Sequence, residues 1–270
     1  MVRVLTLNLW GRHGAWTDRR AALIAGLRAA RPDLVAFQEA FKDEKYDQVR
    51  DLLGPEFSVA HQTVGLLGDG NHGASIASRW PLGDVRELDL HVTHRTADYP
   101  CAALVAEIHV PDPTGPLLFV NHAPSWQWGV ELERELQAVA AARFVEDLVS
   151  RRGLHVVLAG DFNAVPEAAS VRFWCGQQSL GGTSVGYQDA WGSAHPGEPG
   201  HTASPRNPLR VVVGQPRERG RRIDYVLLRC SDHGPTLEVA ACALAFDEPV
   251  GGVWASDHFG VVADLVVPSG

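Results

Sequence analysis

Residues 155–166, HVVLAGDFNAVP, join a buried strand to a short polar turn. The run from residue 155 to residue 160 is apolar at nearly every position, which is typical of a strand covered on both faces. Asp161 and Asn163 follow this run at once. Because Gly, Asp and Asn also favour turns for backbone reasons alone, this single stretch fits either a simple turn or a ligand site at a strand end.

Short runs rich in Val, Leu and Ile recur on both sides of this stretch and predict further strands. These runs are Val2–Leu9, Leu34–Phe37, Ala102–Val110, Leu117–Val120, His155–Ala159, Ile223–Leu228, Leu237–Leu244 and Val261–Val267. Polar residues stand at one tip of many of them: Asn8, Gln38 and Glu39, Asn121 and His122, Asp161 and Asn163, Asp224, and Asp257 and His258. If the first four of these runs point one way and the last two the other, as antiparallel neighbours allow, all the tips lie on one rim.

Helical patterns fall between some of these strands. Residues 18–30 form an amphipathic pattern with Thr17 as a candidate N-cap, and a weaker pattern covers residues 43–53. Residues 131–151 place apolar side chains at helical spacing, namely Leu132, Leu136, Ala140, Phe144 and Leu148. Strands outnumber helices and are often adjacent, so we expect an α+β fold of two packed sheets flanked by helices.

The composition is that of an ordinary folded domain. Of the 270 residues, 45% are apolar and 21% are charged, which excludes a largely disordered chain. The net charge of −8 does not favour sequence-independent binding to nucleic acid, although a locally basic cleft remains compatible with it. We expect a single domain over residues 1–270, with a long Gly-, Pro- and Arg-rich loop at about 192–222.

The four cysteines are too far apart for a metal-binding pair, so we expect free thiols. The N-terminus has no signal-peptide pattern, and no apolar run approaches the roughly 20 residues of a membrane span. We therefore expect a monomeric cytoplasmic protein.

Seven stretches together resemble the endonuclease/exonuclease/phosphatase family, the DNase I-like metal-dependent phosphoesterases. They are LTLNLW, PDLVAFQEA, GASIASRWPL, NHAP, LAGDFNAVP, RRIDYVLLR and SDHFGVV, in the family's order and across nearly the whole chain. The resemblance implies a four-layer α/β/β/α sandwich of two mostly antiparallel sheets, and it implies hydrolysis of a phosphoester. Ala74, Ala77 and Ala203 stand where many members carry larger or more polar residues, which leaves the substrate open.

Hard oxygen ligands among the rim residues predict a site for Mg²⁺ or Mn²⁺. Glu39 is the strongest candidate ligand, and Asn8 and Asp257 are expected close to the ion, directly or through water. Mg²⁺ keeps several of its waters and uses few carboxylates, so a sparse protein shell is expected.

Acid–base chemistry is expected from the remaining rim residues. Asp224 beside His258 predicts an imidazole whose tautomer is fixed by a carboxylate. The resemblance implies that Asp161 positions or deprotonates the attacking water, while the choice between Asp161 and His258 as the base stays open. Asn163 and His122 are candidate donors to the non-bridging phosphate oxygens.

Substrate signals are weaker. Trp126 and Trp128 follow the 117–120 strand and can stack a nucleobase or face a quaternary ammonium. Arg206 and Arg222 belong to an Arg-rich stretch that suits phosphate recognition as well as a solvated loop.

Three functions follow in order of preference. The first is hydrolysis of a small-molecule or lipid-type phosphodiester or phosphomonoester by metal-assisted in-line attack of water. The second is a DNA or RNA nuclease, whose activity should fall steeply with added salt. The third is a catalytically silent binding protein on the same fold, which is disfavoured because none of the candidate residues is missing.

Overall fold

Two β-sheets pack against each other in the computed structural model, which describes residues 1–66, 71–150 and 152–268. The first sheet has the order β12-β13-β1-β2-β4-β3. Its strands are β1 (Val2–Asn8), β2 (Leu34–Phe41), β3 (Ser58–His61), β4 (His72–Ser78), β12 (Glu238–Ala245) and β13 (Gly260–Val266).

The second sheet has the order β11-β10-β8-β7-β6-β5, and β9 also pairs with β10. Its strands are β5 (Leu82–Asp89), β6 (Ala102–Ile108), β7 (Leu117–Ala123), β8 (His155–Asp161), β9 (Tyr187–Asp189), β10 (Asp224–Ser231) and β11 (Gly234–Pro235). The pairs β1–β2 and β7–β8 are parallel, and the other described pairs are antiparallel.

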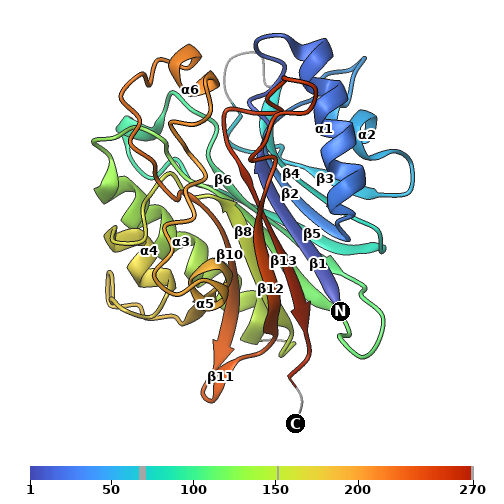
Figure 1. Ribbon diagram of the computed structural model, residues 1–270. Helices are drawn as coiled ribbons and strands as arrows, with labels where there is room; N and C mark the ends of the chain where they lie inside the picture. Colours follow the sequence, from blue (N-terminus) through green and yellow to red (C-terminus); the bar gives the residue numbers. More distant parts are fainter. Residues whose placement is uncertain (67–70, 151, 269–270) are drawn as a thin grey trace.

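Helices cover the outer faces of both sheets, as Figure 1 shows. The helices are α1 (Trp16–Ala30), α2 (Gln48–Leu53), α3 (Glu131–Ser150), α4 (Ala169–Trp174), α5 (Ala190–Ala194), α6 (Leu209–Val212) and the 3₁₀ helix η1 (His94–Thr96). Residues of α1 and α2 share a buried apolar cluster with β1 and β2, whereas α3 and α4 share another with the outer face of the second sheet. The four-layer sandwich expected from the sequence is confirmed.

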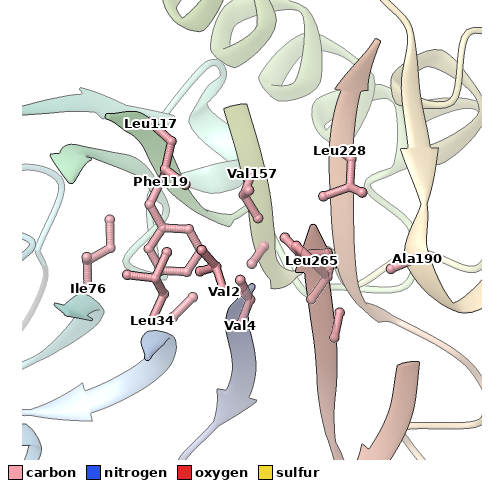
Figure 2. Close-up of a cluster of buried hydrophobic side chains, with 14 of the residues drawn as sticks. Val2, Val4, Leu34, Ile76, Leu117, Phe119, Val157, Ala190, Leu228 and Leu265 are labelled. Atoms are coloured by element: carbon pink, nitrogen blue, oxygen red, sulfur yellow. The ribbon is translucent and has the colours of Figure 1, made fainter. Parts of the chain in front are cut away.

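The largest apolar cluster lies between the two sheets (Figure 2). Val4 and Leu265 from the first sheet meet Phe119, Val157 and Leu228 from the second, and each of these side chains is at most 1% exposed. Every second side chain along these strands faces the other sheet, and this alternation continues to the strand ends. Polar residues that continue the inward-facing series therefore lie at the edge of this inter-sheet core.

Several elements differ in detail from the sequence prediction. Helix α1 begins at Trp16, with Ala15 as N-cap, so Thr17 lies inside the helix. Helix α2 is shorter than expected and begins after Asp47, whose carboxylate accepts a hydrogen bond from the backbone N–H of Arg50. Helix α3 covers the expected residues through 150; position 151, the last of the predicted helix, lies outside the described residues.

The Gly-, Pro- and Arg-rich stretch at 192–222 has more structure than a surface loop. It contains the end of α5, all of α6 and a bridge that pairs Ala203 with Arg221. The four cysteines are free, as predicted. Within the described part of the chain, no helix combines the length and apolar character that crossing a membrane requires.

Candidate active site

The parallel pair β1–β2 brings Asn8 and Glu39 to one strand edge. Asn8 pairs with Gln38 in register, and Glu39 is the next residue of β2. The Asn8 Nδ2 atom donates to Glu39 Oε1 at 3.0 Å. The register of the β2–β4 pair shifts between Phe37 and Ala40, and Glu39 has a left-handed φ of 52°. This bulge gives Glu39 a backbone conformation that a regular strand would not give it.

The antiparallel pair β8–β10 brings two more acids together. Asp161 and Asp224 are direct register partners. Asp161 Oδ1 accepts a hydrogen bond from the backbone N–H of Asn163 at 2.9 Å. Gly160, with a φ of 153°, passes so close to β7 that a Cβ there would lie 2.0 Å from the carbonyl oxygen of His122. Only glycine fits at this position, which explains the Gly before Asp161.

The segment before β13 supplies an acid and an imidazole. The Ser256 hydroxyl donates to the Asn8 carbonyl oxygen at 2.6 Å and so ties this segment to the end of β1. His258 Nδ1 lies 3.0 Å from Asp224 Oδ2 and 3.9 Å from Asp161 Oδ2. Its Nε2 lies 3.9 Å from Asp257 Oδ2. The imidazole is therefore surrounded by three carboxylates.

Side-chain hydrogen bonds cross between the sheets and join the two halves of the site. Asn8 Nδ2 donates to Asp161 Oδ2 at 3.1 Å, and Gln38 Nε2 donates to Asn121 Oδ1 at 2.8 Å. Asn121 in turn donates to the carbonyl oxygens of Phe37 and Ser75. The structure thus assembles six of the predicted site residues in one place, with Asn163 beside them: Asn8, Glu39, Asp161, Asp224, Asp257 and His258.

Burial and mutual repulsion shift the ionisation of these groups. Burial opposes a charged His258, but the carboxylates of Asp224, Asp161 and Asp257 outweigh it and raise its pKa. Burial, followed by the charge of Asp224, raises the pKa of Asp161. Burial, together with the charge of Glu39, also raises the pKa of Asp257. The site therefore favours an imidazolium and has carboxylates in need of positive charge.

The donor set fits a divalent metal ion. Asp161, Asp224 and His258 are buried and each offers a ligand atom within 4.8 Å of the others' ligand atoms. The Asn8 amide nitrogen donates to carboxylate oxygens of both Glu39 and Asp161, so these two acids converge at one point. Hard oxygen donors of this kind suit Mg²⁺ or Mn²⁺, and a cation there would relieve the repulsion that raises the carboxylate pKa values.

Two residues that the sequence did not indicate contact the site. The Tyr99 hydroxyl donates to Glu39 Oε1 at 2.8 Å, and Arg210 Nη1 donates to Asp257 Oδ2 at 2.6 Å. Burial, aided by the charge of Glu39, raises the pKa of Tyr99 well above its usual value, so the phenol stays protonated. Tyr99 follows η1 and Arg210 lies on the short helix α6, so neither is at the tip of a predicted strand.

Two adjoining cavities open on the site. One of about 330 Å³ is bordered by His13, His72 and Asp98, and one of about 190 Å³ by Trp126, Trp128 and Arg221. Four residues line both cavities and lie between them: Glu39, Tyr99, Asp161 and Asn163. The exposed fractions of Trp126 and Trp128 are 46% and 67%, so both predicted substrate contacts stand at the rim of the cleft.

His122 lies on the other face of β7. Because side chains alternate along a strand, the inward direction of Asn121 sends His122 outward. Its ring packs edge-on against Phe162 and Trp174, and burial lowers its pKa to about 3. The structure therefore does not bring His122 together with the other predicted site residues.

The two predicted substrate arginines also lie apart from the cleft. Arg206 pairs with Glu248 on the surface. Arg222 is buried, pairs with Asp189 at 2.6 Å and stacks over the Tyr225 ring at 4.7 Å. Each is engaged by an acid instead of facing the two cavities of the site.

Comparison with known proteins gives a family match and several fold matches. The model of the Endonuclease/Exonuclease/phosphatase family matches residues 5–258. No curated protein matches the sequence. A structure of D. rerio TDP2 complexed with a single-strand DNA product is similar with a TM-score of 0.75 and 20% identity, covering 98% of each chain.

Two further structures show the same fold. An endonuclease/exonuclease/phosphatase from Bacteroides vulgatus has a TM-score of 0.74 at 18% identity, with 99% of each chain covered. The human nocturnin catalytic domain with bound sulfate has a TM-score of 0.71 at 17% identity, with 99% of this chain and 94% of that chain covered. At these identities the similarity establishes the fold, while the site rests on the residues described above.

Proposed function

The chain belongs to the Endonuclease/Exonuclease/phosphatase family of phosphoester hydrolases, and from this premise we propose that it is a divalent-metal-dependent phosphodiesterase acting on a small substrate. One observation carries the proposal. Oxygen donors and an imidazole from both sheets converge in one cleft, where Asn8 bonds to Glu39 and Asp161. Such convergence of acids, amide and imidazole matches the need of phosphoester hydrolysis for charge neutralisation and a positioned water.

Glu39, Asn8 and Asp257 are the residues that would hold Mg²⁺ or Mn²⁺, in a family that generally uses divalent metals. Such an ion, when bound, neutralises phosphate charge and lowers the pKa of a bound water. Asp257 Oδ2 is engaged by Arg210 at 2.6 Å and Oδ1 more weakly by the Ser256 hydroxyl at 3.4 Å, so Oδ1 is the oxygen better able to face the ion. Tyr99 holds Glu39 in place through its hydroxyl.

His258 acts as a cation and hydrogen-bond donor in this proposal. Its raised pKa keeps the imidazolium form at neutral pH, with Nδ1 directed at Asp224. The Nε2–H is then available to a non-bridging phosphate oxygen. Because an imidazolium cannot accept a proton, Asp161 is the better acceptor for the proton of the attacking water.

Asn163 adds an uncharged donor beside Asp161. Asn163 lies in the turn after β8 with a left-handed φ of 53°. Its side-chain amide donates to the carbonyl oxygen of Pro124 at 3.2 Å. The second amide proton can reach a phosphate oxygen. Asn163 lines both cavities, which places it at the point where the two arms of a diester would part.

The charges around the cleft favour a small substrate over a long polynucleotide. Four arginines of the segment 201–222 are paired with acids: Arg206 with Glu248, Arg210 with Asp257, Arg221 with Glu218 and Arg222 with Asp189. Arg217 and Arg219 are the exposed arginines of this segment for which the structure shows no acid partner among the residues it describes, and with a net charge of −8 two such residues do not make the continuous basic track that phosphate backbones require. A nuclease is the second candidate because D. rerio TDP2, with the same fold, has been seen with a single-strand DNA product.

Turnover of a chromogenic diester tests the proposal. We expect the protein to hydrolyse bis(p-nitrophenyl) phosphate with Mg²⁺ or Mn²⁺, to lose this activity with a chelator, and to lose at least about 100-fold in kcat in His258→Ala. His109→Ala is the matched control, because the half-exposed His109 follows the opposite end of β6. Turnover that survives both the chelator and His258→Ala would refute the proposal. Cleavage of oligonucleotides that falls steeply with salt, with no turnover of small diesters, would favour the nuclease.

A further inference from the structure

The smaller cavity of the site has an aromatic and a basic lining. Trp126 and Trp128 line it together with Arg210 and Arg221. Glu39, Asp161, Asp257 and His258 line the same cavity, so its contents lie next to the reacting phosphorus in the proposed mechanism. We refer to Trp126, Trp128 and Arg221 as the aromatic subsite.

The aromatic subsite is connected to the catalytic residues and open to solvent. The Trp126 ring meets Tyr99 edge-on, with 6.4 Å between ring centroids, and the Tyr99 hydroxyl bonds to Glu39. Trp128 is 67% exposed although it is a large apolar side chain. Two exposed indoles beside a catalytic cavity offer flat surfaces on which a ring can stack.

A cation already occupies one face of Trp128. The guanidinium carbon of Arg221 lies 4.3 Å from the centroid of the Trp128 ring, and Glu218 fixes this guanidinium from behind at 2.6 Å. The neighbouring Arg210 points into the same cavity, where it bonds to Asp257. The Arg221 guanidinium therefore already fills a position over Trp128 at which a quaternary ammonium would make its cation–π contact. A planar uncharged ring can stack on an exposed indole without displacing this cation.

Resting on the proposed phosphodiesterase function, we propose that the aromatic subsite binds a nucleobase, so that the substrate is a small nucleotide-type phosphodiester. The cavity of about 330 Å³ on the other side of Glu39 gives room for the second arm of the diester. A choline-type head group, which also joins a phosphate to a second arm, would have to compete with the Arg221 guanidinium for Trp128.

Matched diesters test the subsite. The dinucleotide thymidylyl-thymidine is compared with the same compound lacking both bases and with glycerophosphocholine, in Mg²⁺ buffer. We expect kcat/KM for the dinucleotide to exceed that for the base-free compound by about tenfold, a typical contribution of one stacked base. Trp128→Ala removes this preference, Trp128→Phe retains most of it, and Leu132→Ala, an exposed position on α3, leaves it unchanged.

Binding of products gives a readout independent of turnover. By calorimetry in the same buffer, thymidine 5′-monophosphate should bind about tenfold more tightly than deoxyribose 5-phosphate or phosphocholine, and Trp128→Ala should abolish the difference. Equal or undetectable binding of all three, or tighter binding of phosphocholine, overturns the inference.

The two proposals fail in different ways. If the base-free dinucleotide is cleaved as fast as thymidylyl-thymidine, the phosphodiesterase function stands and the nucleobase subsite falls. If none of the three diesters is cleaved by the unmodified protein, the phosphodiesterase function falls, and the product-binding comparison still decides the subsite.

Discussion

Asp224→Asn is the substitution that separates charge from shape in the proposed mechanism. Asp224 is fully buried, lies 3.0 Å from the His258 imidazole and is the register partner of Asp161. The amide has nearly the same shape as the carboxylate and can still accept a hydrogen bond from Nδ1. The substitution therefore removes one negative charge from the middle of the site while it preserves the packing.

The expected size of the effect follows from the geometry. At 3.0 Å and an effective dielectric constant of about 20, the attraction between carboxylate and imidazolium is about 5 kcal/mol. Breaking a buried ion pair typically costs about 3–5 kcal/mol, so the two figures agree. Asp161 and Asp257, each 3.9 Å from the imidazole, retain part of the stabilisation of the imidazolium. We expect kcat to fall by about 10²-fold, the lower end of a typical acid–base contribution.

The pH dependence carries a sign that distinguishes this mechanism. Without Asp224, the pKa of His258 falls, so the alkaline limb of kcat moves to lower pH. The charge of Asp224 also raises the pKa of Asp161, so the acidic limb moves to lower pH as well. The raised pKa of His258 contributes stability that is complete below about pH 6.5 and is lost as the pH rises through the folded value, so Asp224→Asn should flatten this loss.

A pH–rate profile on bis(p-nitrophenyl) phosphate and thermal unfolding across the same pH range provide the measurement. Asp189→Asn is the matched control. Asp189 forms an ion pair with the buried Arg222, with 2.6 Å between the charged atoms, and this pair does not line either of the two cavities. The control should lower stability and leave the profile in place. A variant Asp224→Asn with kcat within twofold of the parent and an unmoved profile would show that the His258–Asp224 pair has no part in the chemistry.

Three further outcomes are expected. His122→Phe should keep kcat/KM within about twofold. It should also remove a loss of stability on acidification, because burial lowers the pKa of His122 to about 3, so that the stability present above pH 6.5 falls by up to about 5 kcal/mol as the pH decreases to 3. Unfolding by urea between pH 7 and pH 4 measures this loss. Gly160→Ala should cost about 3 kcal/mol or more, since its Cβ would meet the His122 carbonyl, whereas Gly186→Ala, whose Cβ would lie at an ordinary contact distance of 3.8 Å from the Cys230 Cβ, serves as the control in the same unfolding assay. Adding Mg²⁺ or Mn²⁺ to chelator-treated protein should raise the melting temperature, and Glu39→Gln should lose most of that rise in differential scanning fluorimetry; an equal rise in both proteins would place the ion elsewhere.

The sequence predicted the architecture where strands are buried on both faces. The run 155–160 and the runs that begin β1 and β7 are nearly continuous in apolar residues, and all three form central strands. The strands β3 and β5 lie at sheet edges, and β5 is partly exposed along its length, so they lack a continuous apolar run. Edge strands need less apolar surface, and this is why the sequence signal for them is weak.

Helix α3 shows the limit of a periodicity argument. The sequence placed Leu132 and Leu136 on its buried face, yet these side chains are 60% and 43% exposed. The helix instead packs through small residues, among them Ala138, Ala141 and Ala142, which are at most 1% exposed. Small side chains let the helix approach the sheet closely, but large side chains dominate a hydrophobic pattern read from sequence.

The site was predictable to the extent that it is made of strand tips. Asn8, Asp161 and Asp224 lie at strand ends, and Glu39 follows the apolar run 34–37 at the bulge within β2, so a pattern of apolar runs followed by polar residues finds them. The pattern does not show which of two neighbouring tip residues points inward. Asn121 and His122 illustrate this. Because side chains alternate along β7, the Asn121 amide faces the other sheet and the His122 imidazole faces away from it. Tyr99 lies in a loop and Arg210 on a four-residue helix within a long connection, and the placement of both depends on the complete fold.

Assembly of the site and docking of the two sheets are the same event in this fold. Asn8 belongs to one sheet and Asp161 to the other, so the hydrogen bond between them connects the two sheets. The hydrogen bond from Gln38 to Asn121 connects the two sheets in the same way. Each sheet alone carries an incomplete set of groups, because Glu39 lies in the first and Asp224 in the second. Mutual repulsion of the carboxylates opposes docking, while the apolar cluster around Phe119 and Leu265 favours it. The inter-sheet core therefore holds the acids closer together than their mutual repulsion favours, and in the proposed function this confined negative charge attracts the metal ion.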